Sequence, residues 1–250
     1  MHIPDGFLNN GTAGSLMGAA VVAVGFAIKK VRSAFLEKVP VLKARLATFP
    51  DFGGGGSEMS FQNKLTKYGK EKMWKMATIG SLIFSAQMVN FPVSNGTSGH
   101  LLGGVLAALI LGPFEAILVM AAVLSVQSFA FGDGGVLALG ANIFNMAVFG
   151  ALGGYYYFKF LTKNAKDIKK VFLKSAFVAA WLSVVFAAIA TSVEIALSGT
   201  KALAVVLPAM TLTHIAIGFM EGVITVVILS ILIKKNYKLE IFNKEKAYEE

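Results

Sequence analysis

The sequence predicts an all-α integral membrane protein with seven transmembrane helices, its N-terminus outside and its C-terminus inside the cell. Composition is the first reason: 56% of the 250 residues are hydrophobic, 15% are charged, and the mean hydropathy is +0.68. An ordinary soluble domain is about a quarter charged and needs a polar surface along its whole length. Here charged residues are absent from long stretches, so a lipid bilayer is the expected solvent.

The length of the apolar stretches is the second reason, because a helix needs about 20 residues to cross a bilayer. A bend at Leu111, Gly112 and Pro113 is expected to carry the short third helix into the fourth. Small residues four apart, such as Gly14 and Gly18, favour close helix packing, within this bundle or against a membrane partner. The predicted helices span residues 11–28, 76–92, 99–112, 114–131, 135–158, 173–198 and 203–233.

The basic residues are the third reason, and they predict the orientation. Lysine and arginine fall in three blocks, residues 29–75, 159–174 and 234–246, and Lys201 is the only one elsewhere. The positive-inside rule places these blocks in the cytoplasm, which seven crossings satisfy. The net charge of +9 is therefore explained by position, and no nucleic-acid partner is expected.

We expect one membrane domain over residues 1–250. The first apolar segment lacks the features of a cleavable signal, so the mature chain is expected to begin at Met1. Residues 31–74 are polar and contain Pro40, Pro50 and four glycines at 53–56, which predicts a flexible cytoplasmic loop or an artificial linker. Residues 234–250 are expected to form a short helical cytoplasmic tail.

Several function classes are excluded. The chain has no cysteine, so disulfides, thiolate metal sites and cysteine nucleophiles are impossible. It also lacks a His-Glu-x-x-His motif, a serine elbow and a Walker A loop. We therefore expect neither an enzyme of these classes nor a resident cofactor, and energy for transport must come from a gradient or a partner.

The opening residues carry the most specific chemistry. A free Met1 amine followed by His2 offers three nitrogens in sequence: the amine, the His2 amide and His2 Nδ1. They can form fused chelate rings, and a planar nitrogen set suits nickel(II) or copper(II). Pro4, Asp5 and Gly6 have turn chemistry that would fold the terminus back toward the helices. The alternative is a chance histidine after the initiator methionine.

Other polar residues are candidates for the same site. His100, expected in the first turn of the third helix on the side of His2, is the predicted fourth donor, although a hydrated interfacial histidine is the alternative. Polar groups within membrane helices are functional candidates, and these could orient the histidines or only join helices. They are Gln127, Asn142, Asn145 and His214.

Three carboxylates also interrupt the apolar runs: Glu115, Glu194 and Glu221. Glu221 is expected near the middle of the last helix, where an unpartnered charge costs about 3 kcal/mol. It lies seven residues from His214, so both share one helix face. A membrane-embedded enzyme that uses His214 and Glu221 as an acid–base or metal pair is therefore an alternative function.

The start MHIPDGFL and the segment FPVSNGTSGHLLGG at residues 91–104 strongly resemble the CbiM/NikM family. These are the substrate-binding membrane components of energy-coupling-factor transporters for cobalt and nickel. The resemblance covers most of the chain except residues 31–74 and the tail. It implies that Met1, His2 and His100 hold the metal and that Asp5 and nearby polar side chains tighten the terminal loop.

The resemblance also implies partners and a location. The expected partners are a transmembrane coupling subunit, two ATP-binding cassette subunits and often a small accessory membrane subunit. The expected location is the cell membrane, and the transported ligand is nickel(II) or cobalt(II), with nickel favoured. A transporter subunit for an organic substrate is a third hypothesis, and it predicts a larger, aromatic-lined cavity.

Overall fold

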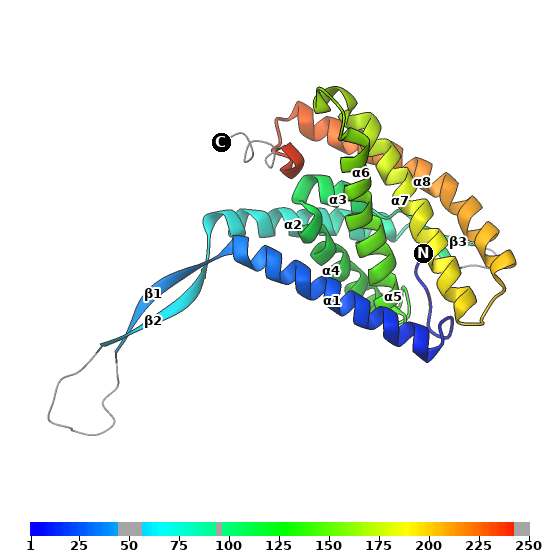
Figure 1. The fold of residues 1–250 in the computed structure, drawn as a ribbon, viewed down its shortest axis with the longest axis horizontal. Helices are drawn as coiled ribbons and strands as arrows, with labels where there is room; N and C mark the ends of the chain where they lie inside the picture. The colour runs from blue at the N-terminus through cyan, green and yellow to red at the C-terminus, as the bar shows by residue number, and fades with distance from the viewer. Residues whose placement is uncertain (45–56, 94–96, 243–250) are drawn as a thin grey trace, which may run out of the picture.

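The computed structural model describes residues 1–44, 57–93 and 97–242, and the described chain is mostly helical (Figure 1). Four of its helices are long and apolar enough to cross a membrane, as judged by length and composition. They are α1 (Asn10–Phe35), α4 (Pro113–Phe131), α7 (Ile168–Leu197) and α8 (Leu203–Lys234). A mostly helical membrane protein is thus confirmed, whereas seven crossings and the orientation of the termini stay predictions.

The other helices are shorter or more polar. They are α2 (Lys67–Gln87), α3 (Gly104–Leu111), α5 (Leu139–Ile143), the π-helix η1 (Phe144–Gly153) and α6 (Gly154–Thr162). The last three follow one another without a break, so the predicted helix at 135–158 is three consecutive helical segments that run to residue 162. Long π-helical stretches are rare and often lie at functional sites.

One predicted boundary is wrong in a way that affects the site. We expected helices at 76–92 and 99–112, but α2 ends at Gln87 and α3 begins only at Gly104. Between them, β3 (Asn90–Pro92) pairs antiparallel with β4 (Ser98–His100). Gly103 then adopts a left-handed φ of +75° before α3 starts. His100 therefore lies on a strand, where its backbone pairs with that of Asn90, and not in a helix.

The region 31–74 also differs from the loop that we expected. Helix α1 continues to Phe35, β1 (Leu36–Ala44) pairs antiparallel with β2 (Ser57–Leu65), and α2 starts at Lys67. The hairpin projects from one end of the bundle (Figure 1). Strand pairing satisfies backbone groups that a loop would leave to water, and polar composition does not reveal it. Pro50 and glycines 53–56 lie outside the described residues.

At the other end of the chain, α8 stops at Lys234, and the part of the predicted tail that the structure describes packs against the bundle. Leu239 and Ile241 are buried, and Lys72 on α2 lies 2.6 Å from Glu240. The Phe242 ring packs 4.8 Å from the Phe172 ring on α7, measured between ring centroids. Residues 243–250 lie outside the described part of the chain.

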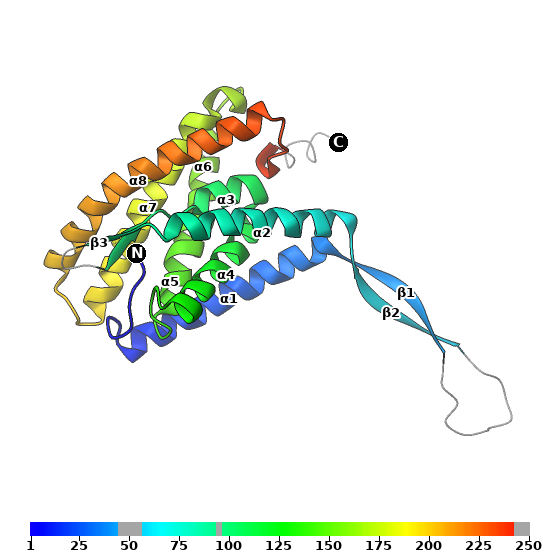
Figure 2. The ribbon, with the colours of Figure 1, turned by 180° about the vertical axis from the view of Figure 1, so that it is seen from behind.

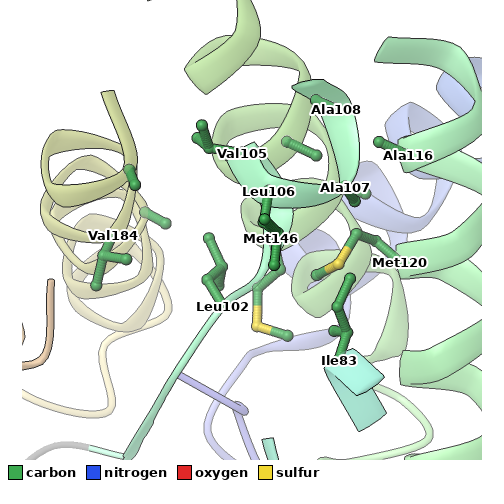
Figure 3. Packing of buried hydrophobic residues seen from close by; sticks show 14 of the residues in the cluster. Ile83, Leu102, Val105, Leu106, Ala107, Ala108, Ala116, Met120, Met146 and Val184 are labelled. Carbon is green, nitrogen blue, oxygen red and sulfur yellow. The ribbon is translucent and has the colours of Figure 1, made fainter. Parts of the chain in front are cut away.

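The core surrounds α3, whose eight residues are all buried. Leu102, Val105 and Leu106 meet Met120 and Met146 from neighbouring helices in this core (Figure 3). Helices α7 and α8 lie side by side in both views (Figures 1 and 2). Their close approach depends on glycine, because a Cβ on Gly218 would come within 2.8 Å of the Trp181 backbone.

Candidate metal centre

The N-terminal segment runs back from the start of α1 into the bundle (Figure 2). Met1, His2 and Ile3 are almost completely buried. The Met1 amine donates to the backbone carbonyl of Ser98 on β4. The Asn142 side chain accepts from the Ile3 amide at 2.8 Å and donates to the Ile3 carbonyl at 3.2 Å. A single asparagine on α5 thus pairs with the terminal segment as a neighbouring strand would.

Asp5 fastens the same segment two residues further on. Its carboxylate accepts from three consecutive backbone amides at the start of α5, those of Val136, Leu137 and Ala138, at 3.2, 2.8 and 3.4 Å. A Cβ on Gly135 would collide with Asp5, so the close approach requires glycine. Asp5 thus joins the terminal segment to the start of α5.

His2 and His100 lie together at the end of this segment. Their rings stack with centroids 4.3 Å apart and an angle of 29° between planes. His100 Nδ1 lies 2.8 Å from the Leu101 carbonyl. Because a carbonyl only accepts, Nδ1 carries the proton and the Nε2 lone pair is free. That Nε2 is buried and has no hydrogen-bond partner among the described residues.

Asp133 is the functional candidate that the sequence reasoning missed. Its Oδ1 lies 2.9 Å from His2 Nδ1, the nitrogen that the predicted chelate uses. A signal existed, because Asp133 stands between two glycines and is the only acidic residue between Glu115 and Asp167. In the free protein, His2 therefore presents Nε2, which has no partner in the described structure, toward the interior.

A cleft of about 510 Å³ reaches His2 from the surface. Asp133 is the only charged side chain among the described residues that line it, and no phenylalanine, tyrosine or tryptophan among them does. A cation that entered this cleft would meet the Asp133 carboxylate beside His2.

Burial holds the nitrogen donors in their neutral forms. It lowers the pKa of the Met1 amine to about 4, against the attraction of Asp133. It also lowers the pKa of His2 and holds that of His100 well below its usual value. For Asp133, burial favours the neutral acid, but the hydrogen bond and charge of His2 outweigh it, so the pKa is lowered. Metal ions bind deprotonated donors, so little proton competition is expected here.

The remaining candidates fall into two groups. Gln127 on α4 is fully buried close to His2, and His214 on α8 is fully buried with Nδ1 donating to the Met210 carbonyl at 2.7 Å. His214 Nε2 has no partner within the described residues. Asn145, by contrast, donates to Glu194 at 2.7 Å and to Thr191 at 3.1 Å, and thus joins η1 to α7.

The buried Glu221 carboxylate has hydrogen-bond partners other than His214. Its two oxygens accept from the backbone amides of Leu102 and Gly103 at 2.9 and 2.7 Å. Each member of the pair suggested for a membrane-embedded enzyme thus bonds to a different backbone group. No group of three or more His, Asp or Glu side chains within the described ranges is arranged to hold a metal, so a site here needs the amine or backbone as well.

Comparison with known proteins identifies the family. Residues 59–239 match the sequence model of CbiM, the cobalt uptake substrate-specific transmembrane region. This chain belongs to the CbiM family. The match covers most of the bundle, whereas the terminal segment that carries Met1 and His2 lies outside it.

Individual relatives agree. A protein of Archaeoglobus fulgidus that carries the name of a fused nickel transport protein, NikMN, is 33% identical over 92% of this chain. The cobalt transport protein CbiM of Thermosipho melanesiensis is 31% identical over 68% of it. The CbiM-family chain spans 64% of the length of the first and 72% of the second.

A crystal structure described as that of a transition metal transporter superposes with a TM-score of 0.75 at 29% identity, and the match covers 98% of this chain and 97% of that one. A truncated transition metal transporter gives the same TM-score at 28% identity, covering 94% and 99%. The likeness therefore extends beyond the family-model match to nearly the whole chain.

Proposed function

We propose that this CbiM-family chain is the substrate-binding membrane subunit of an ATP-driven, energy-coupling-factor type transporter that takes up nickel, cobalt or both. The observation that carries the proposal is the convergence of the Met1 amine, His2 and His100 in a buried site beside a cleft. Neutral nitrogen donors at that point suit a late first-row ion. The proposed supporting residues are Gln127, Asn142 and His214. Asn145 contributes only indirectly, because it bonds to Thr191 and Glu194 on α7.

The ligand set that we propose is the Met1 amine, the His2 amide, His2 Nδ1 and His100 Nε2. Loading then requires His2 Nδ1 to leave Asp133, because one lone pair cannot serve a metal while the nitrogen carries a proton. Rotation of the ring about its Cβ–Cγ bond exchanges the places of Nδ1 and Cδ2. Four nitrogens without thiolate favour nickel over cobalt.

The proposed topology places the chain in the cell membrane with its N-terminus outside and its C-terminus inside. The contacts Lys72–Glu240 and Phe172–Phe242 support one common cytoplasmic side, since they bring the three basic blocks to the same end of the bundle. The chain has no Walker A loop, so we propose that two ATP-binding cassette subunits and a transmembrane coupling subunit supply the energy. The longer fused relatives are compatible with an additional small membrane subunit.

The test is nickel and cobalt binding by the purified protein with a free Met1 amine. Matched variants carry one glycine before Met1, one glycine after Glu250 as the control, or His100→Ala. We expect the N-terminal extension and His100→Ala to abolish tight binding, the C-terminal extension to retain it, and the parent to show the yellow absorption of low-spin nickel. Retained binding in both site variants would refute the ligand set and make His214 and Glu221 the next residues to test.

A further inference from the structure

A groove follows one face of α1 and shares no lining residue with the cleft beside His2. Between α1 and α4 it is a cleft of about 460 Å³ with apolar walls. Met17, Val21 and Val24 line it from α1, and Leu118 lines it from α4. Only 11% of the most apolar stretch of α1 is buried, so this helix leaves most of its surface free to meet lipid.

The groove changes character at the end of α1. A second cleft of about 460 Å³ begins there and shares Gly25 and Ile28 with the first, so the two are continuous. Its charged lining is entirely basic within the described residues: Lys29, Arg32 and Lys38. The structure contains no ion pair between any of these three and another described residue. Three cations thus line this cleft, and no acidic side chain among the described residues lines it.

The dimensions match one leaflet of a membrane. Met17 and Ile28 are eleven residues apart, which corresponds to about 16 Å along an α-helix. Half of a bilayer's hydrocarbon core is about 15 Å thick. The apolar half of the groove therefore has the length of one leaflet, and the cations lie at the depth at which phosphate headgroups begin.

We propose that this groove is a binding site for an anionic glycerophospholipid. Its acyl chain lies between α1 and α4, and its phosphate headgroup contacts Lys29, Arg32 and Lys38. Three cations in a cleft that no described acidic side chain lines favour a lipid with net negative charge over a zwitterionic one, because each basic side chain near an anionic headgroup adds attraction. Gly25 keeps the middle of the groove open, since a Cβ placed there meets nothing within 4 Å.

The test compares phosphatidylglycerol with phosphatidylcholine of the same acyl chains. The delipidated protein in detergent is titrated with each lipid, and bound lipid is counted by native mass spectrometry. We expect the parent to retain phosphatidylglycerol at least about tenfold better. Equal retention of both lipids would overturn the proposal, as would equal competition by inorganic phosphate, because that would show an anion site without an acyl chain.

Variants separate the two halves of the groove. Replacing Lys29, Arg32 and Lys38 together by glutamine should remove the preference for phosphatidylglycerol. The matched control replaces Lys159, Lys163 and Lys166, which removes the same charge from another basic block and should leave the preference intact. If both triple variants lost the preference for phosphatidylglycerol equally, the preference would depend on the net charge of the protein, and a site on α1 would be refuted.

Gly25→Leu should fill the groove and weaken lipid retention without a change of charge. Val22→Leu is the control, because Val22 is exposed, lies on the same helix and does not line either cleft. Unchanged lipid retention in Gly25→Leu would show that no acyl chain lies there. Nickel binding is measured in every variant and should not change, so a failure of this proposal is distinguishable from a failure of the metal site.

Discussion

At the scale of single residues, the proposed metal centre depends on which nitrogen of each histidine is free. His100 donates Nδ1–H to the Leu101 carbonyl, which can only accept, so Nε2 is the nitrogen that could bind the proposed ion. His2 bonds through Nδ1 to Asp133, which can be given up when the ring turns. The two rings stack, and in the proposed ligand set only His2 has to give up a hydrogen bond, the one to Asp133, before its Nδ1 can bind an ion.

This arrangement predicts the proton balance of nickel binding. The Met1 amine is neutral above about pH 4, and burial keeps His2 and His100 neutral as well. Between about pH 7 and 8, only the His2 amide should then lose a proton, so the binding constant should rise about tenfold per pH unit. Calorimetry in buffers of different ionisation enthalpy should give about one proton released per ion. Release of two or more would mean that the amine or an imidazole is protonated in the free protein.

The tautomers can be observed directly, because low-spin nickel(II) is diamagnetic. In ¹⁵N-histidine spectra of the free protein, we expect His2 and His100 both to carry the proton on Nδ1. On nickel loading, His100 should keep that tautomer while His2 changes to Nε2–H. If His2 keeps Nδ1–H and its Nε2 resonance shifts instead, His2 binds through Nε2 and the fused chelate is wrong.

At the scale of elements, the site is made by docking an irregular segment onto the start of a helix. Asp5 accepts from backbone amides at the N-terminus of α5, a position where a carboxylate is favourable. Asn142, one turn further on, pairs with Ile3. Residues 1–5 have no regular structure of their own, so these contacts determine where Met1 and His2 lie.

Asp5→Ala should therefore weaken nickel binding by about 10- to 100-fold, as is typical when a group that orients metal ligands is lost. The matched control is Asp167→Ala, because Asp167 also accepts from a backbone amide at a helix N-terminus, that of Lys169 at 3.0 Å, but belongs to α7 and does not contact the terminal segment. Equilibrium dialysis with ⁶³Ni would measure both. Similar losses in both variants would assign the effect to general destabilisation.

At the scale of the whole molecule, distant helices meet on the short segment that follows His100. Gln87 at the end of α2 donates to the Leu102 carbonyl at 2.8 Å, and Glu221 on α8 accepts from the amides of Leu102 and Gly103. The left-handed Gly103 allows both amides to point at one carboxylate. The position of His100 is thereby tied to two helices far apart in the sequence.

Glu221→Gln should loosen this tie, because a glutamine can accept from one amide but presents an NH₂ group to the other. An unsatisfied buried amide costs about 1–3 kcal/mol, so we expect a lower melting temperature together with weaker nickel binding. The control Glu194→Gln alters another buried glutamate that bonds to Asn145 and not to this segment. Thermal unfolding with and without nickel separates the effects, and unchanged nickel stabilisation in Glu221→Gln would contradict the tie to His100.

The helices and the terminal nitrogen donors were predictable from the sequence, because both depend on local properties of the chain. Apolar runs predicted the regions of the four long apolar helices α1, α4, α7 and α8, since burial in lipid needs a continuous apolar surface. Adjacency in the sequence predicted the Met1–His2 nitrogens, because a chelate ring needs only neighbouring atoms. The strands β3 and β4 were missed, since residues 90–100 read as ends of apolar runs and their pairing depends on two separate segments.

By itself, the sequence determined that the chain is mostly helical, that its apolar helices suit a lipid bilayer, and that Met1 and His2 offer adjacent nitrogen donors. Only the tertiary structure decided which residues meet them. Asp133 reaches His2 across 131 positions, and Glu221 reaches Leu102 across 119. Such contacts have no local pattern, because a buried polar group must find a partner wherever the packed chain supplies one. His2, Glu221 and the strand that carries His100 each have a partner that tertiary packing supplies. The spacing of residues along the sequence does not predict these partners.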